Sequence, residues 1–274
     1  MRRPSLHGAL LAAALAMAGS TASAALLGRN LDGDASTFEA YYDTTLNITW
    51  QADPELARKQ AFGVTGIDAH GGMDAFTAVD WIHGMNAAGY LGYSDWRLPR
   101  TDPINGIHYV IGAPNGDVGY GVSAPWSPYP GSTASEMAHL FYNTLGNLPL
   151  FGGPPNSGTA CATPPQGCLG NPGPFVFTDD WFVGVPGTGV YWSDNKAPIS
   201  HRGNRFAFDF ATGYQSLLPD DLTNAHGWAV RDGDVLSAVP EPGSAALLAF
   251  GLLALAIGTR RCETTSTPVP TEYA

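Results

Sequence analysis

Charged residues are scarce in this sequence, and basic residues are the scarcer kind. Asp, Glu, Lys and Arg supply only 14% of the 274 residues, and 13 basic residues stand against 24 acidic ones, for a formal net charge of −11. A surface of that sign repels phosphate backbones, so nucleic acid is not expected as a partner. The balance favours a soluble extracellular protein, or one that attracts cations.

The sequence also lacks the residue patterns of common catalytic centres. Its seven histidines form no His-x-x-x-His or His-x-His pair, and no Gly-x-Ser-x-Gly motif occurs. We therefore predict a protein that is not an enzyme and needs no cofactor. Two alternatives stay open. Asp-Gly-Asp turns at 32–34 and 232–234 offer oxygen ligands for calcium, and Glu136, Asp179 and Asp180 are the candidate carboxylates of a polysaccharide hydrolase.

Cysteine is rare, with three residues in the chain. Cys161 and Cys168 flank a Pro/Gly-rich loop, and in an oxidising compartment we expect them to form a disulfide. A metal pair is the competing interpretation, but no histidine or third thiol lies nearby to complete such a site. Cys262 is left over, close to the C-terminus.

Glycine (34) and proline (22) are abundant, which favours many short strands and loops over long helices. Two helices are nevertheless expected. The first places Phe76, Val79, Ile82 and Met85 on one face and stops at Gly89. The second begins at a capping box, Thr133-x-x-Glu136. Its apolar face would be formed by Met137, Leu140, Phe141 and Leu145, with Gly146 at its end.

Strands are expected on both sides of these helices. The stretch 36–50 predicts two strands with a turn at 43–45, and further strands are expected at 174–177, 189–193, 204–213 and 227–234. In 204–213, Phe206, Phe208 and Phe210 alternate with Arg205, Ala207 and Asp209, a pattern typical of a half-buried strand. The stretches 101–131 and 147–174 are expected to be long irregular loops.

The N-terminus has the parts of a secretory signal peptide. Arg2 and Arg3 precede an apolar run at 9–18, and the small residues Ala22-Ser23-Ala24 follow it. We predict cleavage after Ala24. The apolar run is too short to span a membrane comfortably.

A second apolar run, 243–258, lies near the C-terminus. As a helix it would extend about 24 Å, and snorkelling arginine stems would make up the rest of a bilayer core. Pro240, Glu241 and Pro242 precede it, and Arg260 and Arg261 follow it. Those arginines would hold their end in the cytoplasm, with the rest of the protein outside.

This order of segments resembles the PEP-CTERM sorting signal, here 239–262, followed by a short polar tail, 263–274. The resemblance implies a transmembrane precursor in the bacterial inner membrane and an exosortase as partner. After cleavage the protein would reach the cell surface or the extracellular space, where exopolysaccharide is often made. Members of the family usually end soon after the arginines, whereas this chain continues for 13 residues.

The region between the two terminal signals, 25–238, resembles the Lcl C-terminal domain family. The matching blocks lie at 43–50, 78–99, 189–195, 205–213 and 227–235, and Gly-x-Ser-Asp-Trp-Arg-Leu-Pro at 92–99 is the most specific. The resemblance implies an α+β fold with a twisted antiparallel sheet and two helices, with the C-type-lectin-like fold as one candidate. It implies no enzymatic activity and suggests glycan binding.

Six residues of these blocks are expected to be structural rather than ligand-binding: Trp96, Arg97, Leu98, Pro99, Trp192 and Trp228. Trp96 and Leu98 would share one face of a strand, and Arg97 would point the other way, toward Asp95 or Asp80. We expect the stacking platforms for sugar rings among the loop aromatics instead, namely Trp126, Tyr129 and Trp181, with Tyr109 and Tyr120 as further candidates. A purely structural role in the extracellular matrix is the other possibility.

Overall fold

The computed structural model describes residues 26–34, 36–112, 116–154, 161, 168–177, 179–180, 185–186 and 189–235, with the backbone alone at 179–180 and 185–186. The expected signal peptide (1–24), the sorting segment (239–262), the polar tail and Trp181 lie outside these residues. Among the helices of the described ranges, none combines the length and apolar composition that a membrane span requires.

Short strands dominate the described chain. They are β1 (Leu26–Arg29), β2 (Ala40–Asp43), β3 (Ile48–Gln51), β4 (Gly72–Met73), β5 (Gly119–Tyr120), β6 (Asp179–Asp180), β7 (Val185–Pro186), β8 (Val190–Lys196), β9 (Asn204–Asp209), β10 (Tyr214–Pro219), β11 (Ala225–His226) and β12 (Val230–Asp232). The helices are α1 (Leu56–Lys59), α2 (Ala75–Ala87), α3 (Glu136–His139), the π-helical turn η3 (Leu140–Thr144), and the 3-10 turns η2 (Tyr90–Gly92) and η4 (Ile199–His201).

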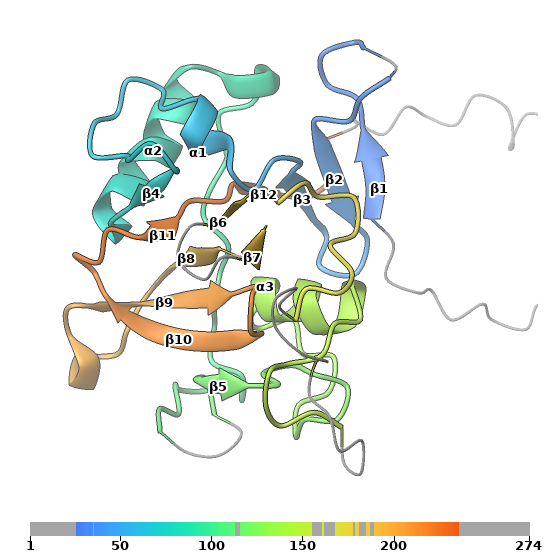
Figure 1. Ribbon diagram of the computed structural model, residues 1–274, viewed down its shortest axis with the longest axis vertical. Helices are drawn as coiled ribbons and strands as arrows, with labels where there is room; N and C mark the ends of the chain where they lie inside the picture. The colour runs from blue at the N-terminus through green and yellow to red at the C-terminus, as the bar shows by residue number, and fades with distance from the viewer. Residues whose placement is uncertain are drawn as a thin grey trace, which may run out of the picture. The chain divides into compact units, whose positions relative to one another are not determined.

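The class is α+β, as predicted, but the strands form two principal sheets rather than one. The first has the order β1-β2-β3-β12, and the second has the order β4-β11-β8-β9-β10-β5. Every pair is antiparallel except β11 with β8. Figure 1 shows α2 and β5 on opposite sides of β8–β10. The segment 174–177, expected to be a strand, has no strand structure; Phe175 and Phe177 instead pack against Trp228.

Helix α2 forms where the sequence predicts a helix, and Ile82 and Met85 of the predicted face are buried, but Phe76 is not. Its N-cap Asp74 accepts a hydrogen bond from the Thr77 amide at 2.7 Å, and the chain turns away at Gly89, whose φ is +59°. The expectation that Phe76 faces inward was wrong, because Trp81 takes the central inward position and Phe76 points to solvent. The buried face consists of Ala75, Ala78, Trp81, Ile82 and Met85.

The second helix has the predicted apolar face but a different start. Met137, Leu140, Phe141 and Leu145 are all buried. Ser135, rather than Thr133, is the N-cap, and it accepts a hydrogen bond from the Ala138 amide. Helix α3 then runs directly into the π-helical turn η3.

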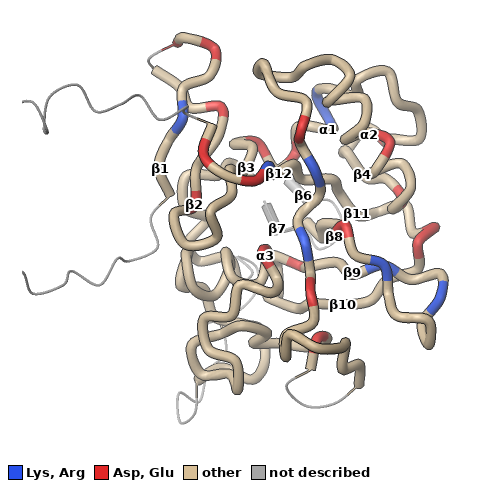
Figure 2. Tube along the Cα trace, turned by 180° about the vertical axis from the view of Figure 1, so that it is seen from behind, with Lys and Arg blue, Asp and Glu red and all other residues tan. Residues whose placement is uncertain are grey.

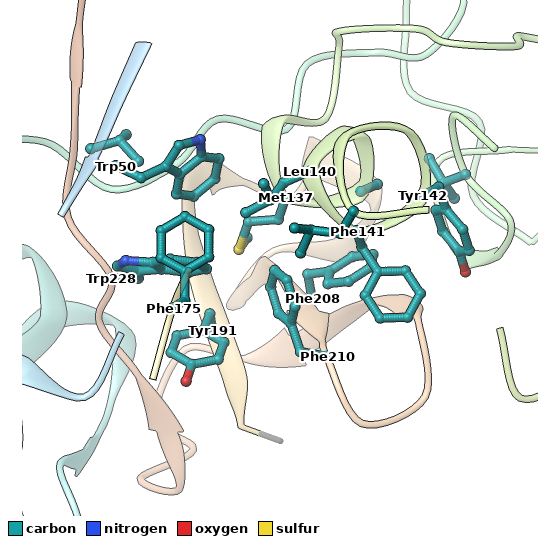
Figure 3. Close-up of a cluster of buried hydrophobic side chains, with 14 of the residues drawn as sticks. Trp50, Met137, Leu140, Phe141, Tyr142, Phe175, Tyr191, Phe208, Phe210 and Trp228 are labelled. Carbon is teal, nitrogen blue, oxygen red and sulfur yellow. The ribbon is translucent and has the colours of Figure 1, made fainter. Parts of the chain in front are cut away.

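Two cores lie on opposite faces of the six-stranded sheet, because neighbouring residues of a strand point to opposite sides. Trp192 and Ala207 pack with α2 in one core, whereas Tyr191, Phe208 and Phe210 pack with α3 and η3 in the other. Figure 3 shows the second core, where the rings of Trp228, Phe175 and Tyr191 meet. The prediction of a half-buried strand at 204–213 was therefore wrong, since both faces of β9 are covered.

The first and last strands of this domain belong to the same four-stranded sheet. Arg29 at the end of β1 donates from Nε and Nη2 to the two carboxylate oxygens of Asp234, each at 2.7 Å. This bidentate pair joins the two ends of the described domain.

Candidate functional site

The Trp-Arg-Leu-Pro segment is part of the framework. Trp96 and Leu98 are buried together in the core beneath α2. The backbone of Arg97 lies between them and pairs with Val230 of β12. The Pro99 carbonyl accepts a hydrogen bond from the amide of Asp194 in β8, so this segment joins both sheets.

The sequence suggested that Arg97 pairs with Asp95 or Asp80, but the structure gives it other partners. Its Nη1 and Nη2 donate to Glu136 at 2.8 and 2.7 Å, and its Nε donates to Asp232 at 3.0 Å. Asp95 instead pairs with Arg231. These partners are 39 and 135 positions away in the sequence, beyond the reach of local pattern.

We call Arg97, Arg100, Glu136 and Asp232 the arginine cluster. One Glu136 oxygen also accepts the backbone N–H of Arg100 at 2.7 Å, and the Arg100 guanidinium lies 3.5 Å from Asp232. Burial would lower the pKa of the Arg97 guanidinium, but the hydrogen bonds and charge of Glu136 and Asp232 raise it overall. Glu136, the one hydrolase candidate whose side chain is described, is thus held by contacts inside the protein.

Trp192 and Trp228, which were also expected to be structural, are enclosed as well. Trp192 donates from Nε1 to the Met73 carbonyl at 2.9 Å, and Trp228 donates to the Gln51 carbonyl at 2.8 Å. Neither side chain is accessible to a ligand. The six residues expected to be structural therefore all lie in buried or ion-paired positions.

A cavity of about 290 Å³ lies among the loops of residues 104–152. We call it the aromatic cavity. It is lined by Ile104, Gly116, Val118, Gly119, Tyr120, Gly121, Val122, Ser123, Ser127, Pro128, Tyr129 and Gly152. Its volume lies near the lower end of the range for small-ligand sites, about 300–1,000 Å³. No charged side chain lines it. In Figure 2, the chain drawn below β10 is almost all tan, which means that few charged residues lie in that part of the described chain.

Ser123 is the unusual polar residue of this cavity. Its φ is +65°, a left-handed conformation that costs a non-glycine residue about 1–2 kcal/mol. Its carbonyl accepts hydrogen bonds from the Gly131 amide and the Asn143 side chain, each at 2.9 Å, which hold it in place. Its hydroxyl is enclosed and has no hydrogen-bond partner among the described residues. A buried hydroxyl without a partner favours a ligand atom that could supply one.

Buried hydrogen bonds fix the cavity walls. The Tyr142 hydroxyl accepts the Gly121 amide at 2.9 Å and donates to the Gly213 carbonyl, and burial raises the pKa of Tyr142, so it remains a donor. Asp117 accepts the backbone amides of Ile104 and Val110, each at 2.6 Å. These contacts tie the walls to η3 and to Gly213, directly before β10, so the cavity is preformed.

The expected stacking residues are in three different situations. Tyr129 lines the cavity with 39% of its surface exposed. Trp126 is half-buried behind it, edge-on to Tyr142, and donates from Nε1 to the Gly152 carbonyl at 3.2 Å. Trp181 lies outside the described residues. Of the further candidates, Tyr120 lines the cavity, whereas Tyr109 packs on Phe206 elsewhere.

The cysteines lie at disulfide distance, with a Cα–Cα separation of 5.1 Å between Cys161 and Cys168. The second Asp-Gly-Asp turn has its carboxylates in ion pairs, since Asp232 contacts Arg97 and Asp234 contacts Arg29. Within the described ranges, no group of three or more His, Cys, Asp or Glu side chains is placed to hold a metal ion.

Ser123 was not identified from the sequence. The signal that could have found it is the run Gly119-Tyr-Gly-Val-Ser123, in which alternate residues have positive φ. A serine in such a run indicates a left-handed position that glycine would fill more comfortably. Comparison with protein-family models, with curated proteins and with solved structures finds no match to this chain.

Proposed function

We propose that this protein is exported, sorted by an exosortase to the cell surface or extracellular matrix, and binds neutral glycan there through the aromatic cavity. The observation that carries the binding proposal is a preformed, uncharged cavity with Tyr129 at its surface and Ser123 in its wall, whose enclosed hydroxyl has no partner among the described residues. Kinship with Lcl C-terminal domains, and through them with C-type-lectin-like folds, is part of the proposal. It rests on the sequence blocks at 92–99 and 227–235.

A sugar ring matches this lining chemically. Its C–H face is apolar and packs on an aromatic side chain, while its hydroxyls donate and accept hydrogen bonds. Tyr129 supplies the ring, and Ser123 and the backbone of the glycine-rich wall supply polar partners. Burial raises the pKa of Tyr120, so this side chain stays neutral near pH 7. A neutral site has no group to attract a strongly charged ligand.

The sorting proposal rests on the terminal sequences. Pro240, Glu241 and Pro242 precede an apolar run that Arg260 and Arg261 close, and a signal peptide at 1–24 would deliver the chain to the inner membrane. The partners proposed are an exosortase and, after cleavage, extracellular polysaccharide.

Glycan binding is tested on an array of neutral exopolysaccharide fragments with the purified full chain, with and without calcium. Tyr129→Ala and Ser123→Ala should each weaken binding at least five-fold, because each removes one contact of about 1 kcal/mol or more. Phe38→Ala is the matched control, since Phe38 is an exposed aromatic outside the cavity. Equal binding by all four proteins would refute the site, and loss of binding on calcium removal alone would move it to a metal.

Sorting is tested by expressing the chain in a bacterium that has an exosortase. Glu241→Ala should leave an uncleaved precursor in the membrane fraction, whereas Glu263→Ala, in the polar tail, should be processed as the wild type is. Immunoblotting of the fractions measures the processing. Identical processing of the two variants would contradict the sorting proposal.

A further inference from the structure

A second hollow lies on the other side of the six-stranded sheet, where α2 begins. We call it the Arg205 groove. It has a volume of about 410 Å³ and is lined by Phe76, Val79, Asp80, Asp194, Lys196 and Arg205. Its floor is the irregular part of the β8–β9 ladder, where the register shifts between Trp192 and Lys196. None of its lining residues lines the aromatic cavity.

Arg205 is buried without a carboxylate partner. Only 3% of the residue is exposed, and its Nη1 donates to the carbonyls of Ser193 and Asp194 at 3.5 and 3.1 Å. Its Nε is enclosed and has no hydrogen-bond acceptor among the described residues. No described carboxylate forms an ion pair with it.

A buried arginine of this kind is costly to the protein. Buried arginines are normally paired, because removing a guanidinium from water without compensation is unfavourable. The cost is visible in the pKa of Arg205, which burial lowers despite the nearby charges of Asp220 and Asp194. An anion in the groove would lie beside the guanidinium and offset part of this cost.

The rim of the groove narrows the choice of anion. Phe76 is 53% exposed, and the Lys196 ammonium lies 6.0 Å from the centre of its ring. Asp80 and Asp194 are exposed at the rim. Carboxylates there accept hydrogen bonds from hydroxyl groups but repel additional negative charge.

We propose that the Arg205 groove binds a polyhydroxylated monocarboxylate, a hexuronate, with its carboxylate at Arg205 and its ring beside Phe76. The hydroxyls of the sugar would donate to Asp80 and Asp194. A phosphate or sulfate ester fits less well, because its greater charge would face those two carboxylates. A neutral sugar has no group for the guanidinium. The site is independent of the glycan binding proposed for the aromatic cavity.

The ligand chemistry has two sources, a free hexuronate or a hexuronate residue within a polysaccharide. The test titrates the purified full chain with sodium D-glucuronate, with D-glucose, and with a glucuronate-containing oligosaccharide, followed by calorimetry. Glucuronate should bind at least ten-fold more tightly than glucose. Tighter binding of the oligosaccharide than of the monosaccharide would assign the site to a polymer, and equal binding would assign it to the free acid.

Variants locate the binding. Arg205→Gln should weaken glucuronate binding at least ten-fold, whereas Arg202→Gln, at an exposed arginine outside the groove, should leave it unchanged. Should Arg205→Gln fail to fold, Phe76→Ala decides, because Phe76 is exposed and its loss leaves the core intact; about three-fold weaker binding is expected. Tyr129→Ala should have no effect on glucuronate. Equal binding of glucuronate and glucose, or undiminished binding by Phe76→Ala and Arg205→Gln, would overturn the proposal.

Discussion

Arg97 and Ser123 lie within 26 positions of each other in the sequence, and the fold treats their polar groups differently. Arg97 donates to two carboxylates, and Glu136 in turn accepts a backbone amide. Ser123 has strained backbone dihedrals and an enclosed hydroxyl without a partner among the described residues. The first arrangement joins distant segments, whereas the second leaves a donor unused.

The difference separates residues that hold the domain together from residues available to a ligand. A fully satisfied cluster loses stability when any member is removed. A strained residue with an unused polar group adds little to stability, so a role in binding is the more direct explanation for its presence. Substitutions in the two regions should therefore have opposite signs in stability.

The largest effect is expected at Arg97. Arg97→Met would leave Glu136 enclosed without its ion-pair partner, and the free energy of unfolding should fall by about 3–5 kcal/mol. Urea denaturation measures this change. Lys59→Met is the control, because the Lys59–Asp53 pair is exposed and should contribute less than about 1 kcal/mol. Equal losses for the two variants would mean that the arginine cluster is no more than a surface ion pair.

A smaller effect of opposite sign is expected at Ser123. Ser123→Gly relieves the left-handed strain and should raise the free energy of unfolding by about 0.5–1 kcal/mol. Ser123→Ala keeps the strain while removing the same hydroxyl, so comparing the two variants isolates the backbone term. Both should weaken glycan binding at least five-fold. A destabilised Ser123→Gly protein would show that the hydroxyl stabilises the fold.

The smallest effect concerns acid pH. Hydrogen bonds from Arg231 lower the pKa of Asp95, so this pair stabilises the fold above the unfolded-state pKa of about 3.9 and loses its contribution as the pH falls below it. The difference in stability between wild type and Arg231→Gln should be below about 1 kcal/mol at pH 7, because Asp95 is 56% exposed, and it should vanish toward pH 2.

A pH-independent difference would instead assign the role of Arg231 to its stacking on Tyr93, at 4.2 Å. Neutral glycan binding should not change over the same acid range unless the domain unfolds, since no carboxylate lines the aromatic cavity. Denaturation curves and glycan titrations on the same samples provide both measurements.

The spacing of apolar residues in the sequence predicted the features that depend on neighbouring residues alone. The position of α2 followed from its apolar periodicity and from Gly89, and the buried face of the second helix followed from its spacing. The pattern was wrong at single positions. Trp81 of the same helix takes the inward position expected for Phe76. Ser135 is the N-cap, and Glu136, expected in the capping box, pairs with Arg97 from a distant segment.

The candidate sites depend even more on distant contacts. Arg205 lies on the face of β9 opposite the three phenylalanines, which the alternation pattern predicts to be the uncovered face, and it is enclosed because α2 covers that face of the sheet. Ser123 acquires its conformation from Gly131 and Asn143. The sequence of β9 alone does not reveal that α2 covers Arg205. The sequence of the loop alone does not reveal which groups donate to the Ser123 carbonyl.

The Arg29–Asp234 pair has a mechanical consequence. Because the first and last strands share the four-stranded sheet, tension applied through the two chain ends would be borne by that sheet and its bidentate ion pair. The six-stranded sheet, which carries β5 and the Arg205 groove, would remain unloaded. A domain built in this way would resist extension between its two ends without deformation at the aromatic cavity or the Arg205 groove.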